Sequence, residues 1–222
     1  MNYFTFKDAL EVEEDGRKVL SVDINPEKSC IFNCLICNKA SVHMGKWHDF
    51  GPVEDSLQAL GEKIAQDRPD LVHIYAKGEP LTNANLENVI NYVHSLGLPT
   101  RLLVNAYLLG VGEHMRVANL SDEVIGGFCF TGEEEFQKIH RPAEGLSAAE
   151  QAESMIRFSN QYPGKFKLRV LLVKGYNDSP EKVAELKALV DQIKYDILWV
   201  GTWPKFTVED ERVAEIEKIL RG

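Results

Sequence analysis

The sequence predicts an α/β fold, a partial (β/α)6, TIM-like barrel with mainly parallel strands. Three observations lead to this prediction. Short apolar runs rich in β-branched residues recur along the chain, loops follow them, and longer stretches with helical spacing follow the loops. Strands that alternate with helices favour a parallel sheet with helical crossovers. Six such units fit the 222 residues, whereas a closed eight-stranded barrel usually needs about 250.

The first two strand–helix units are clearly marked. Residues 18–24 form the first predicted strand, and 54–67 form a helix because apolar residues recur there at helical spacing. The second strand, 71–75, leads into a Gly-Glu-Pro turn. The helix predicted over 83–95 ends before Gly97, since glycine is favoured just after a helix.

The middle of the chain contains two more predicted strands. The third covers 101–104 and the fourth covers 123–130, where two consecutive glycines weaken the strand pattern. Two helical stretches follow, at 133–140 and 148–160. These elements continue the alternation of strand and helix.

The last third of the chain completes the pattern. Residues 168–173 are the clearest strand, and a helix over 180–193 begins with Ser179 as N-cap and proline at its first position. The sixth strand is 196–201, and a final helix covers about 208–220. Loops at the carboxyl ends of the strands are expected to carry the chemistry.

We expect residues 1–222 to form a single core domain. Residues 1–17 are a predicted N-terminal extension, 18–201 contain the six βα units, and 202–222 contain the C-terminal helix. A core of this size leaves little room for a substrate-specific domain. We therefore expect the substrate side of the barrel to be open.

Composition and charge limit the possible functions. The chain is 44% hydrophobic and 27% charged, which is typical of a globular protein and excludes a disordered or coiled-coil chain. The formal net charge of −9 argues against non-specific binding to nucleic acid or anionic membranes. No apolar run approaches the roughly 18 residues that cross a bilayer, and no signal peptide is evident. We expect a cytoplasmic protein with no membrane partner, so its four cysteines need a role other than disulfides.

Three of these cysteines lie within eight residues of one another, just after the first strand. Cys30, Cys34 and Cys37 have the spacing Cys-x3-Cys-x2-Cys. Thiolates this close can converge on one metal centre, either a [4Fe–4S] cluster with one iron left open or a zinc site completed by a residue such as His43. Zinc ligands usually come as two separated pairs, and no second pair is present, which favours the cluster.

These cysteines, together with the Gly-Glu-Pro turn after the second strand, resemble the radical SAM superfamily. Four segments, Asp23–Pro26, Gly78–Pro80, Ile139–Pro142 and Val173–Asp178, resemble landmarks of a subgroup related to tRNA wyosine synthases and, more distantly, to glycyl-radical-enzyme activases. The resemblance implies that the three cysteines bind a [4Fe–4S] cluster and form the catalytic centre. S-adenosylmethionine (SAM) would bind the open iron and be cleaved to a 5′-deoxyadenosyl radical that abstracts hydrogen from a substrate.

The resemblance also implies a SAM site at the ends of the strands. Glu79 would hold the SAM amino group, Asn105 would lie near SAM, and Thr131 and Glu133 would contact its ribose and carboxylate. The residues alone allow structural roles instead: Glu79 and Asn105 in turns, and Glu133 in the acidic first turn of a helix. Since Gly78 and Pro80 set the shape of the turn, we expect the Glu79 carboxylate to be free for the ligand.

Two positions depart from the family pattern. Ile36 stands where an aromatic residue often stacks on adenine, so an aliphatic contact is expected. Lys77 stands where glycine or asparagine is common, and its ammonium could contact the SAM carboxylate, contact the substrate, or point to solvent. The full set of implied cofactor-binding residues is Ile36, Lys77, Gly78, Glu79, Pro80, Asn105, Thr131, Glu133 and Arg169.

Arg169 lies inside the apolar fifth strand, on the face of Leu171 and Val173. If that face lines the barrel, the cation needs an anion such as the SAM carboxylate or a substrate acid; otherwise it is a charge at the rim. Cys129 alone cannot supply a second cluster, so one cluster is expected, with Cys129 packed in the core. The segment 43–48 is either a substrate lid or an ordinary connection.

The leading hypothesis is therefore a radical SAM enzyme with an oxygen-sensitive cluster and an unidentified, possibly macromolecular substrate, either protein or RNA. It would need a one-electron reductant such as flavodoxin or ferredoxin. One alternative is a radical SAM enzyme that acts on a small molecule in cofactor biosynthesis. An alternative of another class is a zinc-stabilised binding protein without catalysis.

Overall fold

The structure is a computed structural model that describes residues 1–37, 40–41 and 45–222. The chain divides into two compact units. Unit 1 comprises Met1–Ile31, Ser41–Val104 and Arg116–Val124, and unit 2 comprises Phe32–Ala40, Asn105–Met115 and Ile125–Gly222. The expected single domain, with its extension, six units and terminal helix, stays a prediction.

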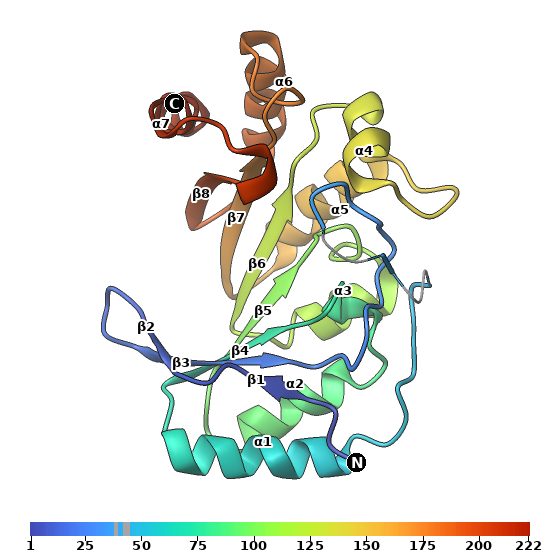
Figure 1. Ribbon diagram of the computed structural model, residues 1–222, viewed down its shortest axis with the longest axis vertical. Helices are drawn as coiled ribbons and strands as arrows, with labels where there is room; N and C mark the ends of the chain where they lie inside the picture. The colour runs from blue at the N-terminus through green and yellow to red at the C-terminus, as the bar shows by residue number, and fades with distance from the viewer. Residues whose placement is uncertain (38–39, 42–44) are drawn as a thin grey trace. The chain divides into compact units, whose positions relative to one another are not determined.

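Unit 1 contains a small mixed sheet with two helices on one of its faces (Figure 1). Its elements are β1 (Thr5–Phe6), β2 (Glu11–Val12), β3 (Lys18–Asp23), α1 (Glu54–Asp67), β4 (Leu71–Tyr75), the 3-10 helix η1 (Pro80–Thr82), α2 (Leu86–Ser95) and β5 (Thr100–Val104). The pairs β3–β4 and β4–β5 are parallel, whereas β1 and β2 pair with β3 in antiparallel orientation.

Unit 2 contains the C-terminal strands and helices. Its elements are α4 (Glu133–His140), α5 (Ala148–Gln161), β7 (Lys165–Leu172), α6 (Pro180–Val190), β8 (Ile197–Thr202), the 3-10 helix η2 (Pro204–Phe206) and α7 (Asp210–Arg221). Strands β7 and β8 are parallel, and α7 packs against both β8 and α6. Two further elements, α3 (Gly112–Ala118) and β6 (Glu123–Phe128), have residues in both units.

The strand order is β1-β3-β4-β5-β6-β7-β8, with β2 paired to β3 outside this order. The six predicted strands correspond to β3 through β8. The prediction of an α/β fold with mainly parallel strands is confirmed, and the order is consistent with a partial barrel.

Several boundaries differ from the predictions, for local reasons. Helix α2 begins at Leu86 rather than at residue 83, because Pro80–Thr82 forms a 3-10 turn before it. Strands β1 and β2 were not predicted, because two residues each are too few to show an alternating pattern. The seven-residue helix α3 was also missed.

The fifth predicted strand, β7, has two distinct faces. Its buried residues are Phe166, Leu168, Val170 and Leu172, which alternate with partly exposed side chains. Arg169 therefore shares a face with Leu171, as predicted. The glycines of β6 do not break that strand. A Cβ at Gly127 would lie 3.0 Å from the backbone oxygen of Arg169, so glycine allows close approach of the neighbouring strand.

A closed ring of four charged side chains stabilises unit 1. Arg101 donates to both oxygens of Glu13, at 2.6 and 2.9 Å, and to Glu123 at 2.6 Å. Arg17 closes the ring with hydrogen bonds of 2.8 Å to Glu13 and 2.7 Å to Glu123. The Arg101 side chain is only 8% exposed, so these carboxylates are needed to offset the free-energy cost of burying its charge. The ring connects β5, the start of β6 and the residues between β2 and β3.

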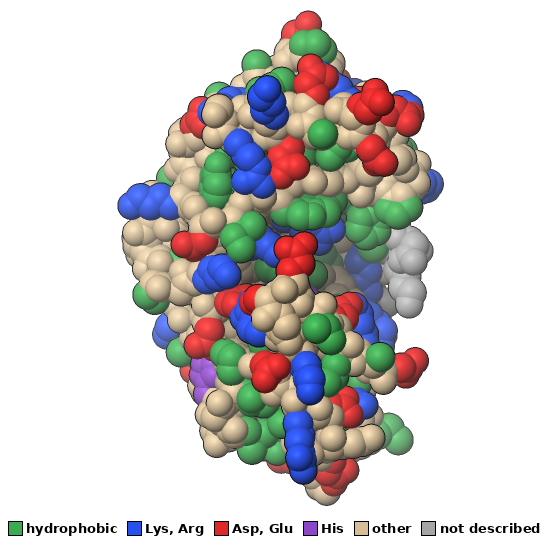
Figure 2. Space-filling view, turned by 90° about the vertical axis from the view of Figure 1, so that its left-hand side faces the viewer, with side chains coloured by type: hydrophobic (Ala, Val, Ile, Leu, Met, Phe, Trp, Pro, Cys, Tyr) green, Lys and Arg blue, Asp and Glu red, His purple; other side chains and the backbone are tan. Residues whose placement is uncertain are grey.

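Acidic and basic side chains are intermixed on the face of the molecule shown in Figure 2. Of the helices in the described residues, none combines the length and the apolar character that crossing a bilayer requires.

We predict that Arg101→Met lowers the free energy of unfolding by about 2–3 kcal/mol, because it leaves two partly buried carboxylates with one shared cation. Urea denaturation measures this change. The matched control is Arg116→Met, which removes an exposed pair with Glu87 and should cost less than about 1 kcal/mol. Equal effects of the two substitutions would contradict the role of the ring.

The same variant has an expected pH dependence. The hydrogen bond from Arg101 is the main cause that lowers the pKa of Glu13 from 4.5. Burial alone would raise the pKa of Glu123, but hydrogen bonds from Arg17 and Arg101 outweigh it and lower that pKa as well. Carboxylates with depressed pKa values stabilise the fold above their unfolded value and lose this contribution as the pH falls. The stability difference between wild type and Arg101→Met should therefore narrow below about pH 4.5.

Candidate functional site

None of the four cysteines forms a disulfide. Cys30 is buried and belongs to unit 1, whereas the half-buried Cys34 and Cys37 and the buried Cys129 belong to unit 2. The segment 29–37 contains the predicted metal-binding motif and is called the cysteine loop below. Its two halves are fixed by different backbone contacts.

In unit 1, the first half of the cysteine loop lies against the Gly-Glu-Pro turn. The Ser29 amide donates to the Lys77 carbonyl at 3.1 Å, and the Glu79 amide donates to the Ser29 carbonyl at 2.8 Å. Gly78 has φ +106°, and a Cβ there would lie 2.0 Å from the Ser29 oxygen and 3.2 Å from the Cβ of Cys30. Only glycine fits, since both the conformation and the close approach exclude a side chain.

Glu79 does not have the free carboxylate that the sequence suggested. Its side chain is fully buried, and Oε1 accepts a hydrogen bond of 3.1 Å from the Leu81 amide. Glu79 is thus the N-cap of η1, whose first residue is Pro80. The hydroxyl of Thr82 donates to the Glu79 carbonyl at 2.7 Å. A carboxylate before a proline-initiated turn is well placed to cap that turn. The role of Glu79 toward SAM stays a prediction.

The partly exposed Lys77 side chain lies beside the segment that leads into the cysteine loop. Its ammonium lies 3.4 Å from the carbonyl oxygens of Asn25 and Pro26 and 3.7 Å from the Asp23 carboxylate. The Lys77 amide also donates to Asp23, at 3.0 Å. These contacts give the landmark Asp23–Pro26 a structural role, because they hold the segment that leads into the cysteine loop.

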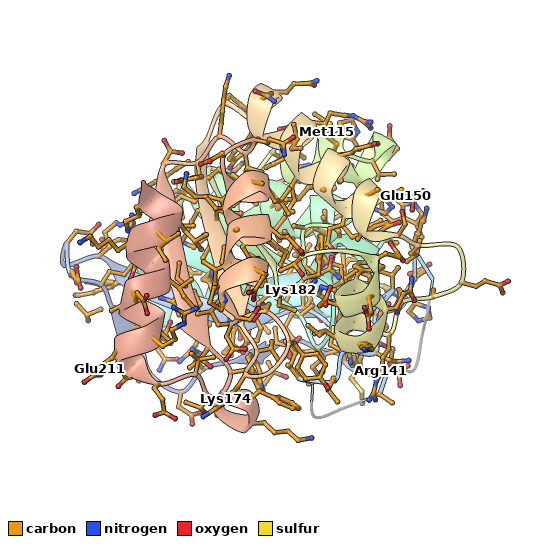
Figure 3. All side chains as sticks on the ribbon, turned by 90° about the horizontal axis from the view of Figure 1, so that it is seen from above. Met115, Arg141, Glu150, Lys174, Lys182 and Glu211 are labelled. Atoms are coloured by element: carbon orange, nitrogen blue, oxygen red, sulfur yellow. The ribbon has the colours of Figure 1, made fainter. Side chains whose placement is uncertain are left out.

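In unit 2, the second half of the cysteine loop is bound to the end of α4. The Asn33 amide donates to the carbonyls of His140 and Arg141 at 3.0 and 3.1 Å, and the Leu35 amide donates to Ile139 at 2.7 Å. Phe32 and Pro142 form an isolated antiparallel bridge. Arg141, labelled in Figure 3 at this end of α4, has φ +46° and terminates the helix. The landmark Ile139–Pro142 is therefore the segment on which this half of the loop docks.

A tight turn and an apolar contact fix the last residues of the motif. The Cys37 amide donates to the Cys34 carbonyl at 2.9 Å. Ile36 packs against a small core of Cys129, Ile139 and Val173. The predicted contact of Ile36 with adenine stays a prediction, and its observed partners are apolar side chains of unit 2.

A buried histidine was missed as a site residue. His140 Nδ1 lies 3.4 Å from the sulfur of Cys34, and Nε2 lies 3.6 Å from the sulfur of Cys129. Burial lowers the pKa of His140 to about 3 and raises the pKa of Cys129 to about 12. At neutral pH the imidazole is uncharged and Cys129 is a thiol. The sequence marked His140 only as part of a landmark, since nothing in the pattern placed it beside a cysteine.

Asn105, Thr131 and Glu133 all have structural hydrogen bonds. Asn105 Oδ1 accepts from the amide two residues later at 3.1 Å, as in a turn. Thr131 donates to Glu135 at 3.1 Å. Glu133 accepts from Gln137 at 2.6 Å and from the first amide of α5 at 2.8 Å. Thr131 and Glu133 also line a cavity of about 460 Å³ whose other walls are mainly residues of α5 and α6. Their roles toward SAM stay predictions.

Arg169 is a cation without an anion. Its guanidinium carbon lies 5.0 Å from the centroid of the Trp199 ring, and its Nε is buried without a hydrogen-bond partner. Burial lowers the pKa of Arg169. Among the residues that the structure describes, no carboxylate pairs with it. An unpaired, largely buried cation is unfavourable by itself, and the role of Arg169 toward an anion stays a prediction.

The segment after β7 is structural. Asn177 is fully buried, donates to the carbonyls of Cys129 and Leu171 at 3.2 and 2.9 Å, and accepts from the Val173 amide at 2.7 Å. Asp178 accepts from the Gly175 amide at 2.7 Å. These bonds explain the landmark Val173–Asp178 without a role in ligand binding.

Two observations bear on metal binding. Over 1–37, 40–41 and 45–222, no three or more His, Cys, Asp or Glu side chains form a group that could hold a metal ion. His43, the additional ligand considered for zinc, and Met44 lie outside the described residues, whereas His48 pairs with Asn83 in an isolated parallel bridge.

No family model matches the chain. The chain is 25% identical over 207 residues to "GTPase Obg" of Brachyspira hyodysenteriae. This alignment covers 90% of this chain and 30% of that protein. The chain is also 24% identical over 179 residues to "UPF0026 protein slr1464" of Synechocystis, in an alignment that covers 79% of this chain and 67% of that protein. The chain thus spans less than a third of the first relative's length. It contains no Gly-x4-Gly-Lys-Ser/Thr motif, the loop that binds nucleotide phosphates in P-loop proteins.

Solved structures show the fold. TYW1 with a lysine-pyruvate adduct has a TM-score of 0.70 at 15% identity, covering 98% of this chain and 83% of that one. A radical SAM methyltransferase from Sphaerobacter thermophilus has a TM-score of 0.67 at 12% identity, covering 100% and 75%. Streptococcus suis SuiB bound to SAM has a TM-score of 0.63 at 16% identity, covering 88% and 42%, and SuiB was also solved with its precursor peptide SuiA.

A domain of a pyruvate-formate lyase-activating enzyme from Bacteroides vulgatus has a TM-score of 0.53 at 15% identity, covering 66% of this chain and 91% of that one. The chain therefore has the fold found in radical SAM enzymes, including the wyosine-synthase and activase types. The resemblance drawn from the sequence is confirmed at the level of the fold.

We predict that Gly78→Ala lowers the free energy of unfolding by about 3 kcal/mol or more, because the new methyl group meets the Ser29 backbone in a strained conformation. Amide hydrogen exchange at Ser29 should accelerate in parallel. Gly97→Ala is the control, since Gly97 also has positive φ, at +78°, but open space around its Cβ position. It should cost only about 1–2 kcal/mol and leave the Ser29 amide protected.

Proposed function

We propose that this protein is a radical SAM enzyme whose single [4Fe–4S] cluster is held by Cys30, Cys34 and Cys37. The observation that carries the proposal is the cysteine loop itself. Three cysteines that form no disulfide, at the spacing Cys-x3-Cys-x2-Cys, lie on a loop whose backbone is hydrogen-bonded in both halves. The chain has the fold found in radical SAM enzymes.

The donor set fits an iron–sulfur cluster. Cysteine thiolates are the usual protein ligands of such clusters, and none of these three cysteines forms a disulfide. A cluster spreads its cysteine ligands over separate irons, so it does not require three side chains around a single ion. The fourth cysteine, Cys129, is held in the apolar core, which agrees with a single cluster.

When bound, the cluster and SAM would supply a 5′-deoxyadenosyl radical that removes a hydrogen atom from the substrate. The chain's own residues would hold these groups in place. Gly78 allows the close approach that sets the position of Cys30. Glu79 provides a buried carboxylate beside the loop, where an ammonium group would be favourable. Ile36, Lys77, Pro80, Asn105, Thr131 and Glu133 stay in the proposed SAM site.

Arg169 is proposed to bind an acidic group, either the SAM carboxylate or an acid of the substrate. Arg169 has no ion pair among the described residues, and the Trp199 ring restricts its position. A guanidinium binds a carboxylate through two parallel hydrogen bonds, which fixes orientation as well as charge.

The proposed substrate is a protein segment. SuiB, which shares the fold, has been solved with a precursor peptide bound. The net charge of −9 and the mixed charges of the visible surface weaken the case for RNA, since binding to phosphates favours a basic stripe. A small molecule of cofactor biosynthesis is the alternative substrate. The chemistry also requires a one-electron reductant, for which a flavodoxin or ferredoxin is proposed.

We predict that replacing Cys30, Cys34 or Cys37 by alanine abolishes both the cluster and the release of 5′-deoxyadenosine from SAM. Iron and sulfide analysis after anaerobic reconstitution, followed by product analysis with dithionite as reductant, tests this. Cys129→Ala is the control and should retain the cluster. A wild-type protein that binds zinc and takes up no iron would contradict the proposal and support a zinc-stabilised binding protein.

We predict that Arg169→Met weakens SAM binding to the reconstituted protein about tenfold or more, through loss of a charge-assisted hydrogen bond. Equilibrium dialysis measures the affinity. Because Arg169 has no ion pair to lose, the substitution should leave thermal stability unchanged or raised. Lys167→Met, on the same face of β7, should change neither. Unchanged SAM affinity in Arg169→Met would show that Arg169 does not bind the SAM carboxylate. An acidic group of the substrate would then be the remaining proposed partner.

A further inference from the structure

His140 is a buried polar side chain that the proposed reaction does not use. It is 4% exposed and stacks on Phe32 with ring centroids 4.6 Å apart and planes inclined by 29°. Phe130 and Phe136 lie at centroid distances of 5.9 and 5.3 Å. In an aromatic environment of this kind a phenylalanine would pack without the cost of burying two ring nitrogens. The retained imidazole therefore calls for a polar role.

Both nitrogens of this imidazole face sulfur. Nδ1 lies 3.4 Å from Cys34 and Nε2 lies 3.6 Å from Cys129. In the part of the chain that the structure describes, these are the hydrogen-bonding partners of the imidazole. His140 therefore connects a proposed cluster ligand with the one cysteine outside the motif.

The positions of the hydrogens follow from the chemistry of the two sulfurs. A Cys34 thiolate bound to iron has no hydrogen, so it only accepts, and Nδ1 must carry the proton for a hydrogen bond to form. Nε2 of the neutral ring is then an acceptor. The Cys129 sulfur lies 3.6 Å from Nε2, where its S–H would be the matching donor. The chain of donors thus runs from Cys129 through His140 to Cys34.

We propose that His140 is a positioning residue that donates its Nδ1–H to the sulfur of Cys34 and so makes the cluster easier to reduce, with Cys129 fixing the required tautomer. The inference rests on the proposed function, because it needs the cluster on Cys34. A hydrogen bond to a ligand sulfur stabilises the extra negative charge of the reduced cluster and raises the reduction potential. The Asn33 amide donates to the His140 carbonyl at 3.0 Å, which joins the segment that carries Cys34 to the residue that carries the donor.

The test is a redox titration of the reconstituted protein, followed by the electron paramagnetic resonance signal of the reduced cluster. His140→Phe keeps an aromatic ring in the same surroundings but removes both nitrogens. At a fixed potential it should lower the ratio of reduced to oxidised cluster about tenfold, which is a shift of the midpoint by about 59 mV to more negative values. Iron content should remain that of the wild type.

His140→Asn is the conservative variant, because its side-chain amide places an N–H close to the position of Nδ1. It should restore most of the wild-type midpoint. Phe130→Leu changes the ring packing around His140 without removing a donor and should leave the midpoint unchanged. An unchanged midpoint in His140→Phe with a full cluster would overturn the inference, as would equal shifts in all three variants.

A measurement on the wild-type protein keeps the inference testable if His140→Phe fails to take up a cluster. Nitrogen-15 NMR of the reconstituted, oxidised protein identifies the tautomer of His140, with His140→Asn used for assignment. The Nδ1–H tautomer is expected, and the Nε2–H tautomer would overturn the inference. A wild-type protein that binds no cluster would instead contradict the proposed function, so the two failures are distinguishable.

Discussion

The close contact of Gly78 with the backbone of Ser29 is the constraint on which the proposed site depends. A loop that presents three thiols to one cofactor cannot be left to side-chain packing, because small displacements of a ligand weaken a metal site. Backbone hydrogen bonds from the Gly-Glu-Pro turn fix one half of the cysteine loop, and the end of α4 fixes the other half. Three segments that look like isolated landmarks in the sequence, Asp23–Pro26, Gly78–Pro80 and Ile139–Pro142, thus share one task, which is to hold the loop that carries the cysteines.

The sequence predicted the repeating pattern of the fold well, because periodicity reports on long elements. Helix α1 and strand β4 lie at their predicted bounds. Partners of individual side chains were harder to predict, since they depend on contacts between distant segments. Glu79 was expected to be free and is a buried cap, whereas Lys77 lies beside the carbonyls of Asn25 and Pro26. The contact of His140 with Cys34 was not predicted, because the two residues are 106 positions apart in the sequence.

Packing alone does not explain two buried groups that lie near the proposed site. Arg169 has a cation with no anion, and His140 has a neutral ring between two sulfurs. Natural proteins retain such unfavourable groups mainly where they serve a function. By contrast, the charges of Arg101 and Arg17 are balanced by Glu13 and Glu123, and that ring is explained by stability.

The central claim is that the cysteine loop holds a cluster with one iron open to SAM. The most direct measurement is the electron paramagnetic resonance spectrum of the reduced, reconstituted protein before and after SAM is added, together with its iron content. We expect about four irons per chain and a spectrum that changes when SAM binds the open iron. A full cluster whose spectrum is unaffected by saturating SAM, or a protein that binds no iron, would contradict the claim.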